Sequence, residues 1–167
     1  AAVRLEWNCE VLHNMRVLGV DPGTGLTGYA VLSSGGTVLE SGTLHITTAQ
    51  VIDRRWGVVV DPIKALLHKW NPDLVVVESS HNQRKHPVSK KRKRVNTPDD
   101  HNAHAAGMCQ QLARAILVAI DDRGIKRLFP TPTQARHGMT RKSAHRWLDV
   151  KMAGLSSHEK DAINLAW

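Results

Sequence analysis

Two apolar segments that each end in an acidic residue constrain the fold of this chain more than any other feature. Arg16–Asp21 and Asp73–Glu78 are rich in Val and Leu, and each has the length of one strand. Apolar runs without polar alternation are typical of strands that are buried on both faces of a sheet. Because ligands gather at the carboxyl ends of strands in open α/β sheets, Asp21 and Glu78 are candidate site residues.

The remaining periodic segments place these two strands in a larger sheet. Short turns separate the first strand from the two that follow it, which predicts an antiparallel meander. Later strands alternate with segments of helical spacing, one of which contains Pro62, where we expect a kink or break. The further expected elements are strands at 27–33, 37–44 and 126–129, and helices at 50–70, 102–122, from 131, 140–152 and from 156. The sequence predicts an α/β fold with a five-stranded mixed sheet, three antiparallel strands and then two parallel ones, and helices on both faces.

Charge narrows the class of partner. The 167 residues include 23 Lys or Arg and 15 Asp or Glu, which gives a net charge of +8 and favours nucleic acid over a membrane surface. Two cysteines are too few for a disulfide scaffold, which favours a reducing, cytoplasmic setting. No apolar run approaches the roughly 20 residues of a membrane span, so we expect no membrane partner.

Basic residues gather in two segments. Seven of the eleven residues from Arg84 to Arg94 are Lys or Arg, and this run starts six residues after Glu78. That proximity favours contact with DNA phosphates, although a solvated charge run and a nuclear-localisation patch are alternatives. A second group follows at Arg136, Arg141 and Lys142, for which ordinary helix-surface charge is the alternative.

The acids themselves indicate a divalent cation. Two carboxylates at the ends of neighbouring central strands repel each other unless a hard cation such as Mg²⁺ or Mn²⁺ lies between them. On the final helix, His158 and Asp161 are three residues apart and share one face. The alternatives are that Asp21 and Glu78 are helix caps or solvated loop residues, and that His158 and Asp161 are surface groups in a first helical turn.

Three segments resemble one known family. RVLGVDPGTGLTGYAVL, PDLVVVE and HEKDAINLA are similar to the RuvC family of Holliday junction resolvases, in its His-bearing branch and of the phage type. DPGTG alone is also similar to the phosphate loop of sugar kinases and actin-like ATPases. The resemblance runs from Met15 to the end of the chain. It implies an RNase H-like fold and a homodimeric crossover junction endodeoxyribonuclease that acts on four-way and other branched DNA, in the cytoplasm of a bacterial or phage-infected cell.

The resemblance also implies roles for individual residues. Asp21, Glu78, His158 and Asp161 match the catalytic and metal-binding positions, where two Mg²⁺ ions, replaceable by Mn²⁺, support phosphodiester hydrolysis. Asp21 would bridge both ions, while Glu78 would hold the product-side ion and Asp161 the nucleophile-side ion. His158 would ligate while neutral or move a proton. The expected DNA-binding residues are His81, which replaces the family's base-stacking aromatic, and Arg84, Lys85, Lys90, Lys91, Arg92, Lys93, Arg94, Arg136, Arg141 and Lys142.

Two further expectations concern boundaries and alternatives. Residues 1–14 show no clear period and are expected to be an upstream extension or residues added in cloning, whereas residues 15–167 are expected to form a single nuclease domain. The alternative functions are a structure-specific DNA-binding protein with weak catalysis and a YqgF-like RNA-processing nuclease.

Overall fold

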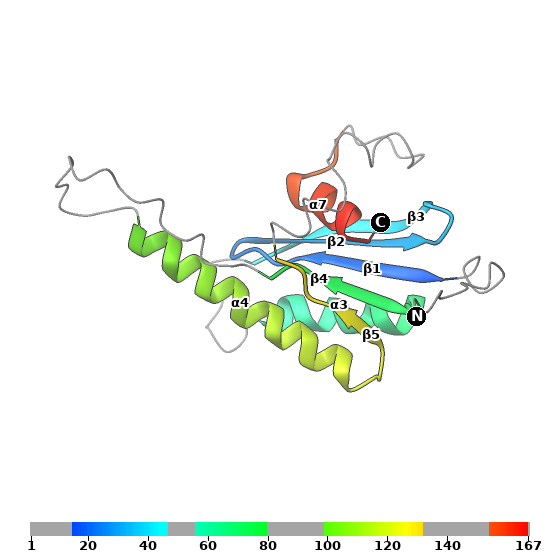
Figure 1. The fold of residues 1–167 in the computed structure, drawn as a ribbon. Helices are drawn as coiled ribbons and strands as arrows, with labels where there is room; N and C mark the ends of the chain where they lie inside the picture. The colour runs from blue at the N-terminus through cyan, green and yellow to red at the C-terminus, as the bar shows by residue number, and fades with distance from the viewer. Residues whose placement is uncertain (1–14, 47–55, 80–98, 132–153, 167) are drawn as a thin grey trace, which may run out of the picture.

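A five-stranded mixed sheet forms the centre of the computed structural model (Figure 1). The structure describes residues 15–46, 56–79, 99–131 and 154–166, and side chains of the long helix from residue 107 onward. The strands are ordered β3-β2-β1-β4-β5 across the sheet. The elements are β1 (Arg16–Asp21), β2 (Leu26–Ser33), β3 (Val38–His45), α3 (Gly57–Trp70), β4 (Leu74–Val77), α4 (Asp99–Asp121), β5 (Lys126–Leu128) and α7 (Ser157–Ala166).

The pairing of the strands agrees with the sequence-based expectation. β1 pairs with β2 and β2 with β3 in antiparallel registers. β4 runs parallel to β1, with Val77 opposite Val20, and β5 runs parallel to β4. The predicted sheet of three antiparallel and then two parallel strands is therefore confirmed. Figure 1 shows α7 on one side of the sheet and α3 and α4 on the other, so helices cover both faces.

The face under α3 and α4 is built from large aliphatic side chains. Strand residues that alternate along the chain point to this face, and they pack against both helices. The largest members of this core are fully buried, and burial of such aliphatic side chains stabilises the fold. They include Leu18, Val20, Val31, Val59, Ile63, Leu67, Val75, Val77, Leu112, Ile116 and Ile120.

The opposite face, under α7, combines alanine and glycine with the larger side chains of Leu32 and Ile163. Ala30 packs there against Ala162, Ile163 and Ala166 of the helix. A Cβ atom at Gly28 would collide with the backbone carbonyl of His158, and one at Gly19 with that of Ala162. The helix backbone thus lies directly on the strands, at an approach that only glycine permits at these two positions.

The structure tests two expectations about the first helix. Of the kink or break expected at Pro62, the break does not occur, because α3 continues through it from Gly57 to Trp70. Pro62 cannot donate the hydrogen bond to the Val58 carbonyl, and the buried face of Val59, Ile63, Leu66 and Leu67 holds the helix in place despite this loss. The predicted stop at Asn71 is confirmed: this residue is left-handed, and its N–H donates to the Leu67 carbonyl (3.1 Å).

Several expected elements lie outside the described residues. They are the terminal segment 1–14, the start of the first helix before residue 56, and the helices expected from residue 132 to 153. The prediction that residues 15–167 form one domain stays a prediction.

Candidate functional site

The ends of β1 and β4 lie next to each other in the sheet. Asp21 is the last residue of β1, and Glu78 directly follows β4. The Glu78 N–H donates to the carbonyl of Val20 (3.0 Å), so the pairing continues one residue past the strand. Since Val20 and Val77 point into the core under α3 and α4, alternation places Asp21 and Glu78 on the α7 face. Neighbouring strands are about 4.8 Å apart, so two carboxylates share one small area of this face.

A capping box starts the helix above these acids. The Ser156 hydroxyl accepts a hydrogen bond from the Glu159 N–H (3.1 Å), and the Glu159 carboxylate accepts one from the Ser156 N–H (3.1 Å). This reciprocal pair satisfies two donors at the start of α7 and confirms the helix start expected at Ser156. His158 and Asp161 follow in the first turns of the helix.

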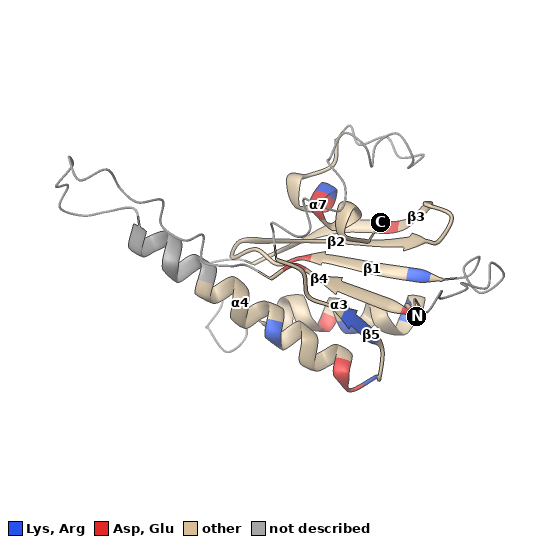
Figure 2. Ribbon diagram, viewed as in Figure 1, with Lys and Arg blue, Asp and Glu red and all other residues tan. Residues whose placement is uncertain are grey.

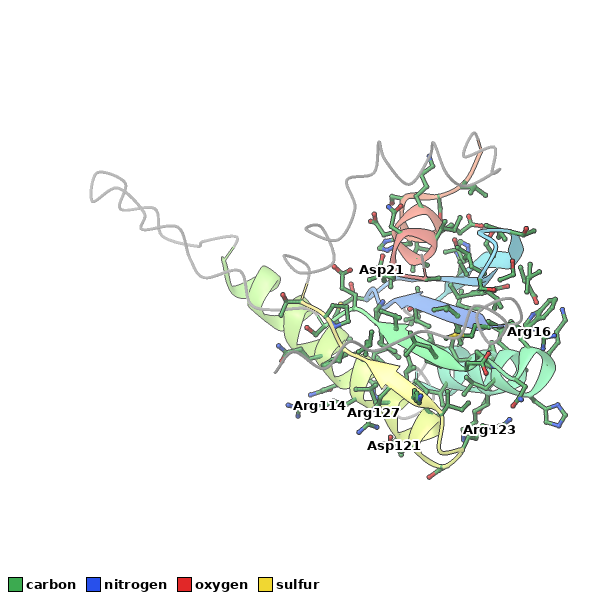
Figure 3. The ribbon with its side chains drawn as sticks, turned by 45° about the vertical axis from the view of Figure 1, so that its right-hand side comes forward. Arg16, Asp21, Arg114, Asp121, Arg123 and Arg127 are labelled. Atoms are coloured by element: carbon green, nitrogen blue, oxygen red, sulfur yellow. The ribbon has the colours of Figure 1, made fainter. Side chains whose placement is uncertain are left out.

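Asp21 and His158 are in direct contact. His158 Nδ1 lies 2.6 Å from Asp21 Oδ2, although the two residues are 137 positions apart in the sequence. The pair forms a hydrogen bond when the imidazole has its proton on Nδ1, because a carboxylate oxygen can accept it. The Asp21 side chain is 11% exposed and that of His158 is 32% exposed, so solvent reaches the pair from the histidine side. Figure 3 shows Asp21 beneath α7, at the opposite end of the sheet from Arg16.

The turn after β1 closes around the same histidine. A Cβ atom on Gly23 would lie 3.1 Å from His158 Cε1, so the Pro22–Gly23 backbone borders the imidazole. The Gly23 N–H points to the hydroxyl of the fully buried Thr27 at 3.5 Å, within the same turn. The turn chemistry of the DPGTG segment therefore shapes one wall of the candidate site.

The donor chemistry of these groups fits a hard divalent cation. Asp21, Glu78 and Asp161 offer carboxylate oxygens and His158 a ring nitrogen, which is a set that Mg²⁺ and Mn²⁺ accept. Across the described ranges, however, no three His, Cys, Asp or Glu side chains are close enough to form a metal cluster. The structure thus brings Asp21 and His158 together, while the four-residue metal site stays a prediction.

Acidic and basic residues are mixed over most of the described part of the chain. Figure 2 shows acidic segments at the end of β1 and on α3, β3, the end of α4 and α7, and basic segments on α4, β5, α7 and the opposite end of β1. The residues expected to bind DNA fall in segments 80–98 and 132–153, outside the described residues. They are His81, Arg84, Lys85, Lys90, Lys91, Arg92, Lys93, Arg94, Arg136, Arg141 and Lys142.

Sequence reasoning missed two groups near the site. On β3, the Ser41 hydroxyl donates to Glu159 (3.3 Å), and the Thr43 hydroxyl lies 2.8 Å from that of Ser156. On α4, burial raises the pKa of the Cys109 thiol, and the negative charge of Asp21 raises it further. The only signal for Ser41 and Thr43 in the sequence is the spacing of two hydroxyls on one face of a strand.

Sheet order and site define a class of fold. Antiparallel β1 to β3, parallel β4 and β5, acids at the ends of β1 and β4 and an acid on the last helix form the RNase H-like arrangement. None of the helices among the described residues has the length and apolar character needed to cross a membrane.

Sequence comparison then gives the family. Residues 17–90 match the family model described as crossover junction endodeoxyribonuclease RuvC. The RuvC protein of Dictyoglomus turgidum is 40% identical over 68 residues, which cover 39% of this chain and 43% of that protein. That of Thermomicrobium roseum is 41% identical over 66 residues, covering 38% and 40%. The matched segment thus spans less than half the length of these relatives, and the similarity in sequence to the RuvC family lies within residues 17–90.

Solved structures extend the likeness of the fold over most of the chain. The structure of T. thermophilus RuvC in complex with a Holliday junction substrate superposes with a TM-score of 0.67, at 21% identity, over 92% of this chain and 90% of that chain. The yeast mitochondrial Holliday junction resolvase Ydc2 gives a TM-score of 0.53, at 14% identity, over 93% and 79%. The described chain therefore has the RuvC fold.

Proposed function

We propose that this protein is a metal-dependent endonuclease that cuts Holliday junctions and other branched DNA. The observation that carries the proposal is the pairing of Asp21 with His158 at the end of β1, next to Glu78 and within a RuvC-family segment. The relatives named crossover junction endodeoxyribonuclease support the same activity. A RuvC bound to a Holliday junction supports four-way DNA as the substrate.

The four site residues divide the work of phosphodiester hydrolysis. Asp21, Glu78 and Asp161 would hold Mg²⁺, two ions in each site, with Mn²⁺ as a substitute. Divalent cations supply an activated water and stabilise the leaving 3′ oxygen when they are bound. His158 orients the Asp21 carboxylate through its Nδ1–H, which leaves the opposite ring nitrogen to accept a proton or to act as a ligand.

Two basic segments that lie outside the described residues would bind the DNA backbone. The run from Arg84 to Arg94 begins after Glu78, and the group at Arg136, Arg141 and Lys142 precedes α7. Lys and Arg without aromatic neighbours bind phosphates and do not distinguish bases. Changing Lys90 to Arg94 to serine should flatten the salt dependence of junction affinity, by about 0.9 in slope for each phosphate that the variant no longer binds. An unchanged slope would assign the phosphate binding to the second group.

The proposed homodimer would use the outward face of α4. Leu112 and Ile116 of this helix are fully buried within the chain, so they are not available to a partner. Gln111, Arg114 and Val118 are exposed at helical spacing on the opposite face, with Val118 62% exposed. Val118→Asp should shift the protein towards the monomer in light scattering, while Asp122→Asn should not. A wild-type protein that is monomeric at micromolar concentration would contradict the dimer.

One assay separates the proposed function from its alternatives. The protein is incubated with a synthetic four-way DNA junction, a linear duplex and an RNA hairpin, each with Mg²⁺ and with a chelator. We expect cleavage of the junction alone, only with Mg²⁺, and none by Asp21→Asn. Junction binding without cleavage would support a structure-specific binding protein instead, and preferential cleavage of RNA would support a YqgF-like nuclease.

A further inference from the structure

An edge strand that contributes no site residue is attached to the helix turn that carries His158. In the described sheet, β3 pairs with β2 and lies at the opposite edge from β5. Ser41 stands opposite Ala30, and Thr43 opposite Gly28, in the register of β2 and β3. Ala30 and Gly28 both lie under α7, so Ser41 and Thr43 belong to the same face.

Four side chains connect this strand to the start of α7. Ser41 donates to Glu159 Oε1 (3.3 Å), and Thr43 Oγ1 lies 2.8 Å from Ser156 Oγ. Glu159 and Ser156 are joined to each other by the capping box, at 3.1 Å for both bonds. We call Ser41, Thr43, Ser156 and Glu159 the β3–α7 clamp. All four residues are half-buried, which strengthens hydrogen bonds by limiting competition from water.

The clamp opposes rotation and sliding of the first turn of α7, which the apolar part of the helix interface does only weakly. Below its first turn, α7 is held by apolar side chains, among them Ala30 and Leu32 of β2. Apolar contacts are non-directional, so they oppose separation of the helix from the sheet more than rotation or sliding along it. A capping box satisfies donors of the helix itself and is equally effective on a helix in any position. The bonds from Ser41 and Thr43, by contrast, fix the first turn relative to the strands.

His158 lies inside this fixed turn. It is between Ser156 and Glu159 in the sequence, and its carbonyl rests directly above Gly28, opposite Thr43. A small rotation of the turn would separate Nδ1 from Asp21, because a hydrogen bond of 2.6 Å tolerates little displacement.

We propose that Ser41 and Thr43 are positioning residues, which hold the first turn of α7 where His158 meets Asp21. The effect on cleavage rests on the proposed function, whereas the effect on the helix does not. Neither residue touches the Asp21–His158 pair directly, so both act through Ser156 and Glu159.

The test compares three variants with the wild-type protein. Ser41→Ala combined with Thr43→Val removes both hydroxyls from β3. Thr43→Ser keeps its hydroxyl and should behave as wild type. Glu40→Gln is the matched control, because it removes the charge that accepts hydrogen bonds from Lys69 and Trp70, on the same strand but on the other face of the sheet.

Hydrogen exchange gives a result that is independent of cleavage. In the double variant we expect the amides of residues 157–161 to exchange faster by roughly five-fold to thirty-fold, since two hydrogen bonds of ordinary strength are removed. The His158 Nδ1 resonance should move towards that of an imidazole without a hydrogen bond. Both should stay unchanged in Thr43→Ser and Glu40→Gln. Equal exchange in the double variant and the wild-type protein would overturn the proposal.

Kinetics on a four-way junction give the second result. We expect kcat of the double variant to fall by roughly ten-fold to a hundred-fold, as for other groups that orient a metal-site ligand, with KM for the junction unchanged. Faster exchange with an unchanged kcat would mean that the clamp holds the helix but not the histidine, which overturns the proposal. A wild-type protein that cuts no junction would overturn the proposed function alone, and the exchange and resonance data would still decide the role of the clamp. Should the double variant not fold, each single variant removes one bond and is read in the same way.

Discussion

The two faces of the sheet meet their helices in different ways, and they serve different purposes. Both contain large aliphatic side chains, Leu32 and Ile163 among them under α7, but only the α7 face has glycines that let the helix backbone reach the strands. Under α3 and α4, Leu18, Val20, Val31 and Val75 make a thick aliphatic layer. Under α7, the corresponding positions are Gly19, Gly28 and Ala30, and the helix backbone rests on the strands. The charged residues of the candidate site all lie on the α7 face of the sheet or on α7 itself.

This difference has a physical reason. Burial of aliphatic area stabilises a fold in proportion to its amount, so large residues on the α3 and α4 face supply most of the stability. Contact between a strand-end carboxylate and a helix side chain depends on how close the two backbones come, and a large residue beneath α7 would hold them apart. The predictions that follow test whether stability and site geometry are indeed separated between the two faces.

The largest expected effect is loss of cleavage in Asp21→Asn, on the α7 face. The amide is almost the same size but has no charge to hold a divalent cation, so we expect the cleavage rate to fall by at least about 10²-fold to 10³-fold. Junction binding without metal should persist, because the phosphate contacts are expected elsewhere. Asp122→Asn, at an exposed position, is the control. A rate near that of the wild-type protein in Asp21→Asn would disprove the assignment of the metal site.

The next effect belongs to the opposite face. Ile63 is fully buried between α3 and the sheet. Ile63→Ala should lower the free energy of unfolding by about 2–5 kcal/mol, and Ile63→Val by only about 0.5–1.5 kcal/mol. Denaturant titration measures both values. The cleavage rate per folded molecule should stay near that of the wild-type protein at low temperature. A rate that falls in parallel with stability would show that the α3 and α4 face also determines the geometry of the site.

Gly28→Ala tests the close approach of α7. The added methyl group would collide with the His158 carbonyl, so the helix or the strand must shift, at a cost of about 1–3 kcal/mol in stability. Because the collision is at His158 itself, cleavage should fall by more than the loss of folded protein explains. Gly35→Ala, where the nearest atom to the new Cβ would be the Ser33 hydroxyl at 3.8 Å, is the matched control. Equal loss of cleavage in both variants would contradict the claim that the close approach of α7 at Gly28 positions His158.

A smaller effect is expected in the pH dependence of stability at Glu40, on the α3 side of β3. The hydrogen bond from Lys69 lowers the pKa of the Glu40 carboxyl below its usual 4.5, and that from Trp70 lowers it further. A depressed pKa stabilises the folded state above pH 4.5, and this contribution is lost as the pH falls through the folded-state value. Glu40→Gln should therefore cost under about 1 kcal/mol at pH 7, and the difference from wild type should shrink below pH 4.5. A pH-independent difference in urea titrations would contradict this origin.

The smallest effect concerns the reactivity of Cys109. Burial raises the pKa of its thiol, and the Asp21 charge raises it further, so the thiolate fraction at pH 8 should be low. In a Cys9→Ser background, alkylation should be slower than for a free cysteine. Asp21→Asn should speed it by a factor of a few, because one of the two causes is removed. No change in the alkylation rate would show that the charge of Asp21 does not reach α4.

Much of this molecule was predictable because its signals are local. The apolar runs at 16–21 and 73–78 and the capping spacing from Ser156 to Glu159 depend on neighbours in sequence, and the structure contains all of them. The break considered at Pro62 does not occur, because burial of one face of α3 against the sheet outweighs the single hydrogen bond that the proline cannot donate, and such burial is a tertiary effect. The strand end at Asp21 and the helical spacing of His158 and Asp161 made these residues candidates, and the family resemblance assigned their roles, whereas the contact of Asp21 with His158 appeared only in the folded chain.

The sequence by itself determined that the sheet is mixed, that acidic residues end β1 and follow β4, and that the capping box of Ser156 starts α7. Each of these follows from alternation, turn chemistry or capping, which act over a few residues. Only the tertiary structure decided that α7 lies on Gly19 and Gly28, that its first turn is bonded to Ser41 and Thr43, and that His158 meets Asp21. Those contacts join residues more than a hundred positions apart, and their partners are chosen by how closely two backbones pack, which no local pattern records.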